Sequence, residues 1–432
     1  MASASLAGLV LVGALLPTAA GAAWTAPVTL SAAGRQANSA QVGIDTQGDA
    51  VFAWRRFDGT NWRIQARARS AAGTLSSIQN LSAPGQNASR PQVAVDADGD
   101  AVFTWERFDG TKWRVQSRAR SAAGVLGPAQ TLSAAGRHAT LPQLGVDSAG
   151  NAVFTWQRSD GTSWRVQSRA RSAAGALGPV QTLSAAGQDA VTPQVAVDPA
   201  GRAVFTWQRS EQYLRIEARF RSAAGALSPV QFLSTGRSPQ VGVDAHGNAV
   251  FAWNRHVSSP SEPRGATRVQ ARARTAAGAL SPIQNIVDPG PGGGGCACDP
   301  QVAVDPTGDA VFTWGLLSDY LGQFRWVQVR ARSASGTLSP IQSLTPNAGQ
   351  EAGVHPQIGI DAAGNAVITW HFESGISVQV RSAGGALGPL QTFPISGVSP
   401  LPQVAVDGAG DAVVTWVNSN GTNTVIQAAA GP

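Results

Sequence analysis

The apolar positions of this chain recur in one fixed phrase of 15 residues, seen for example from Pro91 to Trp105. Each copy has a short apolar run such as Gln92–Val95, a turn of the form Asp-x-x-Gly, and a second apolar run that ends on tryptophan. The closing tryptophan occurs eight times, at Trp54, Trp105, Trp156, Trp207, Trp253, Trp314, Trp370 and Trp416. Because Asp and Gly favour tight turns, the phrase predicts two short strands joined by a turn.

Two further strands complete each unit. In the second unit, Asp109-Gly110 turns the chain into the run Trp113–Arg120, and a Ser-Ala-Ala-Gly turn leads to a last strand at Gly127–Leu132. Successive tryptophans are 46 to 61 residues apart, and helical periodicity is absent from the repeats. Four short strands at this spacing are typical of a propeller blade. The sequence therefore predicts an all-β fold, an eight-bladed β-propeller of four-stranded antiparallel blades.

The two ends of the chain complete one blade between them. The last unit, Pro402–Ala428, has only three strands, and Trp24–Ser31 matches the fourth strand found at Leu177–Ser184. We expect the N-terminal strand to close the last blade, since closure removes the exposed edges of an open array. Residues 23–432 are therefore predicted to form a single propeller domain.

Residues 1–22 have the pattern of a secretory signal peptide. Leu6–Leu16 is apolar but too short to span a bilayer, and Ala20-Gly21-Ala22 fits a cleavage site, although the preceding segment lacks Lys and Arg. We expect an exported monomer, extracellular or at the cell surface, with no membrane insertion.

The repeat resembles the bacterial secreted β-propellers, and is distantly similar to their sialidase-type and lectin-type members. The resemblance covers the mature chain, but the sialidase Asp-box (S-x-D-x-G-x-T-W) is not matched, because the spacings here are longer. The resemblance implies the propeller fold and either glycan binding or glycan processing.

Arginine supplies all of the 32 basic residues except Lys112, against 26 acidic residues, which gives a net charge of +6. In the third strands, Arg114, Gln116, Arg118 and Arg120 share one face by their period of two. Such a face would suit an anion or a nucleic acid, or would join neighbouring blades. Recurrence in most blades favours the joining role, so no nucleic-acid partner is expected. A glutamine opens every first strand, either as a polar collar for a ligand or as a partner for backbone groups of the next blade.

Aromatic residues flank the Asp-Gly turns of the first three blades: Phe57, Trp62, Phe108, Trp113 and Trp164. They are either stacking platforms for sugar rings or cross-strand pairs, and we favour the pairs. Asp96–Asp100 is similar to a calcium loop, but the sister loops lose its acidic residues, so we predict no metal and no cofactor.

The repeat breaks in the loops of blades four to seven, between the second and third strands. Both tyrosines and several charged residues occur in the loops of blades four to six. The predicted ligand-binding residues are Tyr213, His256, Glu262, Arg264, Asp319, Tyr320 and Phe324. Cys296 and Cys298, the only cysteines, follow a glycine-rich run and are predicted to form a disulfide in an oxidising compartment.

These features predict an exported binding scaffold that recognises a glycan or a protein through loops on one face. The alternative is a glycoside hydrolase or lyase, or a sialidase-like enzyme, on the same face, with carboxylates drawn from Glu211, Glu262, Asp319 and Glu373. We assign no catalytic residue, because no unit offers a nucleophile with its base, and whether the chain is an enzyme stays open.

Overall fold

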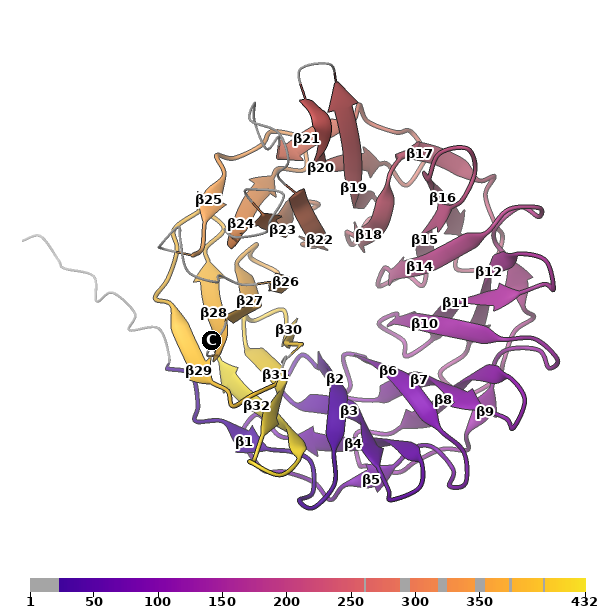
Figure 1. Ribbon diagram of the computed structural model, residues 1–432, viewed down its shortest axis with the longest axis vertical. Coiled ribbons are helices and arrows are strands. Elements are labelled where there is room, and N and C mark those ends of the chain that lie inside the picture. The colour runs from indigo at the N-terminus through magenta and orange to yellow at the C-terminus, as the bar shows by residue number, and fades with distance from the viewer. Residues whose placement is uncertain are drawn as a thin grey trace, which may run out of the picture.

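A computed structural model describes residues 23–259, 262–287, 296–317, 325–345, 354–372, 375–398 and 401–432. These residues form eight blades arranged around a central axis, as predicted, and no helix occurs among them (Figure 1). In the same ranges, no helix is long and apolar enough to cross a membrane.

The first strand of each blade lies nearest the axis (Figure 1). The first strands are β2 (Ala37–Ile44), β6 (Ala88–Val95), β10 (Ala139–Val146), β14 (Ala190–Val197), β18 (Arg237–Val243), β22 (Cys296–Val304), β26 (Val354–Ile360) and β30 (Gln403–Val406). Most of them begin before the apolar run that the sequence shows. In β6, for example, a bulge between Ser89 and Gln92 extends the strand back to Ala88.

The second strands are the most buried, since each is covered on both faces by neighbouring blades. They are β3 (Ala50–Phe57), β7 (Ala101–Phe108), β11 (Ala152–Ser159), β15 (Ala203–Arg209), β19 (Ala249–Ser259), β23 (Ala310–Leu317), β27 (Ala366–Phe372) and β31 (Ala412–Ser419). All eight repeat tryptophans lie on these strands and are buried. The core therefore consists of layers between blades, as where Ile64 and Leu81 of blade one pack against Phe103 and Trp105 of blade two.

The third strands carry the arginine pattern. They are β4 (Trp62–Arg69), β8 (Trp113–Arg120), β12 (Trp164–Arg171), β16 (Arg215–Arg221), β20 (Glu262–Arg274), β24 (Arg325–Arg332), β28 (Gly375–Arg381) and β32 (Thr424–Gly431). The short outer strands are β5 (Gln79–Asn80), β9 (Gln130–Thr131), β13 (Gln181–Thr182), β17 (Gln231–Thr235), β21 (Gln284–Val287), β25 (Gln342–Ser343), β29 (Gln391–Pro394) and β1 (Val28–Thr29).

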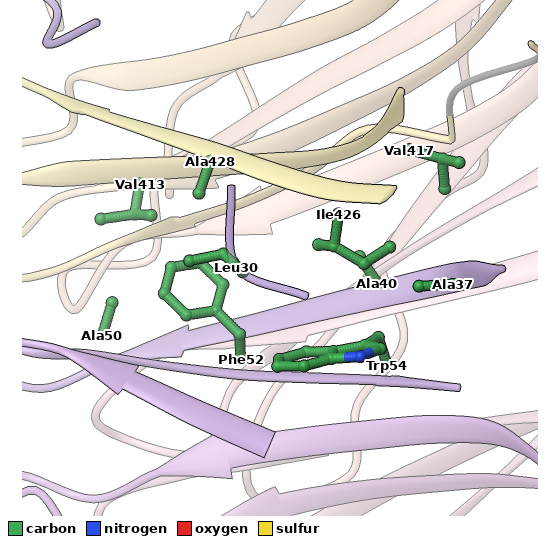
Figure 2. Packing of buried hydrophobic residues seen from close by; sticks show 10 residues of the cluster. All are labelled: Leu30, Ala37, Ala40, Ala50, Phe52, Trp54, Val413, Val417, Ile426 and Ala428. Carbon is green, nitrogen blue, oxygen red and sulfur yellow. The ribbon is translucent and has the colours of Figure 1, made fainter. Parts of the chain in front are cut away.

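Closure by the N-terminal strand is confirmed. β1 pairs antiparallel with β32, with Val28 opposite Ala428 and Thr29 opposite Gln427. Leu30 is buried together with Phe52 and Trp54 of blade one and Ile426 of blade eight (Figure 2). The two ends of the sequence therefore share one sheet and one part of the core.

Arginine side chains join the blades, which confirms the structural interpretation of the third strands. Arg118 of blade two donates to the carbonyl of Leu81 in blade one at 3.3 Å, and Arg120 donates to Gln79 Oε1 at 2.9 Å. Gln79 in turn donates to the carbonyl of Gly124 at 2.7 Å. We call this reciprocal Gln–Arg contact the blade staple. It occurs at the six junctions from blade one to blade seven, with glutamines Gln79, Gln130, Gln181, Gln231, Gln284 and Gln342.

Blades five and six are joined further, into one eight-stranded sheet. A single parallel bridge between Thr267 of β20 and Cys296 of β22 makes the connection. Cys296 and Cys298 are bonded as a disulfide with their Cα atoms 5.5 Å apart. Whether the pair is oxidised in the purified protein stays a prediction, tested below.

Candidate ligand-binding site

One face of the ring, which we call the loop face, carries two sets of loops. They are the loops between second and third strands and the connections from each fourth strand to the next first strand. At the start of the first strand, a non-glycine residue adopts a left-handed backbone in seven of the eight blades. These residues are Ser39, Arg90, Leu141, Thr192, Ser238, Asp299 and His355, with φ between 50° and 57°. Such a conformation is costly for these residue types, so the surrounding bulge must impose it. The blades share this backbone and vary the side chain that it presents on the loop face.

A hollow of about 510 Å³ opens on this face between blades one and two. We call it the indole hollow, because Trp62 and Trp113 both contribute to its wall, together with Arg55, Asn87, Arg90 and Glu106. Its volume lies in the range of sites for small ligands. No other blade repeats this combination of residues.

The two tryptophans are held at the starts of β4 and β8, directly after the Asp-Gly turns. Trp62 lies 5.5 Å from Phe57 between ring centroids, and Trp113 lies 5.6 Å from Phe108. These are the cross-strand pairs expected from the sequence. Both indoles are nevertheless only half-buried and line the hollow. Their position therefore also allows a sugar ring to stack on them.

Arg55 covers Trp62, with its guanidinium carbon 4.3 Å from the ring centroid. It also donates to Asn38 Oδ1 and to Ser89 Oγ, the latter at 3.3 Å. Burial, and then the charge of Arg90, lower the pKa of Arg55. The two guanidinium groups at the hollow, those of Arg55 and Arg90, are therefore close enough to repel each other.

Glu106 lies at the base of the hollow with a buried carboxylate. Arg90 Nη1 donates to both of its oxygens at 3.0 Å, and the amide of Leu141 in blade three donates to Oε1 at 2.7 Å. Burial raises the pKa of Glu106, while these donors oppose the rise. Arg90 itself is 55% exposed at its side chain, so it is held from below and remains open to a ligand.

The residues predicted from the sequence lie elsewhere on the loop face. Tyr213 is 67% exposed, and His256 is exposed on β19 opposite Thr267. Glu262 and Arg264 lie on β20 by their backbone. Asp319, Tyr320 and Phe324 fall in residues 318–324, outside the described residues. The predicted ligand site of blades four to six is therefore untested.

The opposite face has two hollows that are repeats of one another. One, of about 400 Å³, lies between blades five and six beside Asp244 and Arg274, and the other, of about 300 Å³, lies between blades one and two beside Asp45 and Arg69. Their aspartates accept backbone amides of the Asp-x-x-Gly turns, as in the bond from Gln47 N to Asp45 Oδ1 at 2.8 Å. Because equivalent residues recur in both, we attribute these hollows to the scaffold.

The eight glutamines of the first strands are half-exposed: Gln41, Gln92, Gln143, Gln194, Gln240, Gln301, Gln357 and Gln403. Across the described ranges, no hydrogen bond joins their side-chain amides to a neighbouring blade. The suggestion that they satisfy backbone groups of the next blade is therefore not supported.

Comparisons with known proteins show the fold alone. No family model and no curated protein sequence matches the chain. Among solved structures, the Dos1 propeller is 9% identical over 94% of this chain and 94% of its own, with a TM-score of 0.56. The WD40 domain of SCAP from fission yeast is 9% identical over 94% and 98%, with a TM-score of 0.54. An α-L-arabinofuranosidase from Fusarium graminearum is 11% identical over 67% and 92%, and its TM-score of 0.45 is too low to support an argument.

Proposed function

We propose that this propeller is a binding scaffold that recognises a carbohydrate, without cleaving it, in the indole hollow. The observation that carries the proposal is the meeting of Trp62 and Trp113 with Arg55, Arg90 and Asn87 around one hollow. Indole rings offer large apolar contact to the faces of sugars, and the planar polar groups offer hydrogen bonds to their hydroxyls.

The pattern of variation between blades supports a specific site here. The residue after each repeat tryptophan is Arg55 in blade one, Glu106 in blade two and Gln157 in blade three, whereas the staples and turns repeat almost unchanged. A ligand that meets one junction requires that junction to differ from the others. The repeated parts supply a rigid platform for the part that varies.

Binding is favoured over catalysis by the state of Glu106. It is the only carboxylate among the described residues that line the hollow, and both of its oxygens already accept hydrogen bonds. Glycoside cleavage generally uses two carboxylates on either side of the scissile bond. A panel of glycosidase and lyase assays on the secreted protein tests the enzymatic alternative.

Two tryptophan variants test the binding site. Trp62→Ala and Trp113→Ala should each weaken binding to soluble polysaccharides by about tenfold or more, measured by affinity electrophoresis, because each removes a large contact surface. Trp164→Ala is the matched control, since Trp164 begins β12 at the same repeat position and does not line the hollow. Equal binding by all three variants and the wild type would place the ligand elsewhere.

The loops of blades four to six remain a second proposed location, supported by the exposure of Tyr213 and His256. Replacing the blade-five and blade-six loops by Arg107–Thr111 should preserve folding, because this turn already joins two strands in blade two. Loss of binding in the loop replacement, with normal binding by Trp62→Ala, would assign the ligand to blades four to six. The opposite result supports the indole hollow.

We further propose that residues 1–22 direct export and that the mature chain, a monomer, acts outside the cell. The apolar run and the small-residue cleavage site support this. N-terminal sequencing of secreted protein should begin at Ala23, and a start at Met1 on cytoplasmic material would contradict it.

A further inference from the structure

Positive charge gathers on the loop face of blades one to three, around the indole hollow. Among the described residues, Arg35, Arg55, Lys112 and Arg137 take part in no ion pair, and Arg90 is exposed beside them. We call these five residues the basic arc.

Two arginines of the arc, Arg35 and Arg137, lie against Asp-Gly turns of the loop face. A Cβ atom added at Gly59 would lie 2.8 Å from Arg35 Nη1, and one at Gly161 would lie 2.7 Å from Arg137 Nη2. Arg35 and Arg137 therefore lie over the Asp-Gly turns of blades one and three. Beyond burial, Arg35 lowers the pKa of Arg56, and both Arg114 and Arg137 lower that of Arg158, so like charges are close at both turns.

Blade five keeps Arg255 and Arg268 at the positions equivalent to Arg56 and Arg63, whereas the remaining blades neutralise or lack this charge. In blade four, Glu211 pairs with Arg209 at 3.2 Å and with Arg215 at 2.8 Å. In blades six to eight the positions equivalent to Arg56 and Arg63 are apolar or neutral: Leu316, Trp326, Phe372, Gly375, Asn418 and Val425. The charge is therefore concentrated in blades one to three, with a further pair of arginines in blade five, and does not follow from the repeat alone.

We propose that the ligand of the indole hollow is an acidic polysaccharide, a polymer with carboxylates on its sugar rings, which extends from the hollow across the basic arc. This inference rests on the proposed function and names its ligand class. Ring carboxylates would meet Arg90 and Arg55 in the hollow, and those farther along the chain would meet Arg35 or Arg137. Guanidinium groups suit carboxylates because they present two parallel donors.

The turns of the arc favour a sugar polymer over a nucleic acid. Each turn also carries an aspartate, Asp58, Asp109 or Asp160, which lies 3.5 to 3.7 Å from an arginine of its own blade. Backbone amides of Ser163 and Thr162 lower the pKa of Asp160 to about 2, so this carboxylate stays ionised. Sugar hydroxyls can donate to such carboxylates, whereas the phosphodiester groups of a nucleic acid can only accept hydrogen bonds.

Matched probes test the ligand class. Polygalacturonate and alginate are compared with fully methyl-esterified polygalacturonate and with single-stranded DNA, by calorimetry at low and physiological salt. The acidic polysaccharides should bind at least about tenfold more tightly than the ester, and salt should weaken their binding. The double variant Arg35→Gln, Arg137→Gln should lose about tenfold in affinity for the acids and show a weaker salt dependence. Arg237→Gln, which removes one exposed arginine of blade five outside the basic arc, is the control and should bind normally.

The outcomes separate this inference from the proposed function. Equal binding of the acid and its ester, with loss in Trp62→Ala, would keep the carbohydrate site and overturn the acidic ligand. Binding of DNA alone would overturn both proposals. Failure of both acidic polymers to bind, while a neutral polysaccharide binds, would likewise overturn this inference and leave the proposed function standing.

Discussion

At the residue scale, Glu106 shows how one side chain sets the chemistry of a blade junction. Its carboxylate accepts the amide of Leu141 from the next blade, and in blade three Gln157 Oε1 accepts the amide of Thr192 at 3.2 Å in the same way. An amide therefore suffices for the structural contact. The negative charge of Glu106 is not needed for this contact. It instead forms the ion pair that holds Arg90 at the hollow.

This comparison predicts a pH-dependent stability difference. Burial raises the pKa of Glu106 above its ordinary 4.5, so the folded protein binds this proton more readily than the unfolded chain does. The contribution of Glu106 protonation to the free energy of unfolding is fully present below the pKa of Glu106 in the unfolded chain. It is lost as the pH rises through the higher pKa of Glu106 in the folded protein. Wild type should therefore lose stability relative to Glu106→Gln as the pH rises from below 4.5 towards neutrality.

Denaturant unfolding of wild type and Glu106→Gln across this range measures the difference in their free energies of unfolding. The other titrating groups occur in both proteins, so their contributions cancel. Arg90→Leu with Glu106→Gln is the matched control, because it copies the Leu141 and Gln157 pair of blade three. A difference that is constant with pH, or that moves in favour of wild type as pH rises, would contradict the prediction.

At the element scale, the blade staple is missing at both junctions of the closing blade. Val28 in β1 takes the place of Gln79, since Val28 lies opposite Ala428 as Gln79 lies opposite Ala66. Gly431 in β32 takes the place of Arg120. The blade built from both termini is therefore held by its closing strand and its core, without the contact that joins the other blades.

Exchange of the two residue types measures the staple. Gln79→Val should cost about 1–3 kcal/mol, because it leaves Nε of the buried Arg120 without its acceptor. Val28→Gln, made in the wild type, should add a staple at the closing blade by offering Arg69 an acceptor. The lost packing of the valine should offset part of this gain in stability. Urea midpoints of the single variants decide the matter. A midpoint unchanged by Gln79→Val would mean that the staple contributes nothing.

The disulfide is a second feature at this scale, with little expected effect on stability. Cys296 and Cys298 are two residues apart, so their bond closes a very small loop and restricts the unfolded chain little. Cys296→Ser with Cys298→Ser should shift the unfolding midpoint only slightly. Thiol titration of the denatured wild type without reductant should find no free thiol, and two reactive thiols would contradict the prediction.

Sequence periodicity predicted elements better than the site, for a physical reason. Strands such as Trp113–Arg120 follow from neighbouring residues and turn chemistry, and they appear with the predicted bounds. The outer strand expected at Gly127–Leu132 is reduced to Gln130–Thr131. Gly127 instead makes isolated hydrogen bonds, accepting from the Arg118 side chain and donating to the carbonyl of Ala119. The indole hollow combines Arg55, Glu106 and Trp113 from two blades, and only packing of the blades shows that they meet.

At the scale of the whole molecule, the ring depends on a strand that is most distant in sequence from its partner. Thr25 N donates to Ala430 O and Leu30 N to Ile426 O, both at 2.8 Å, and Ser31 Oγ accepts from Ile426 N at 3.0 Å. Closure was predictable because the missing fourth strand of the last unit stands at the start of the chain. Its energy comes from these bonds and from burial of Leu30.

Deletion of residues 23–31 should open the ring at blade eight. It removes the pairing of β1 with β32 and the buried side chain of Leu30, which alone is worth about 2–5 kcal/mol in a packed core. The exposed edge of β32 would then be free to pair with another chain. We expect a clearly lower urea midpoint and concentration-dependent association in light scattering. Adding a peptide of Ala23–Ser31 in trans should restore the midpoint and suppress association, because it can refill the vacant strand position, whereas a scrambled peptide should do neither. A truncated protein that unfolds at the wild-type midpoint would show that β1 is not needed to close the ring.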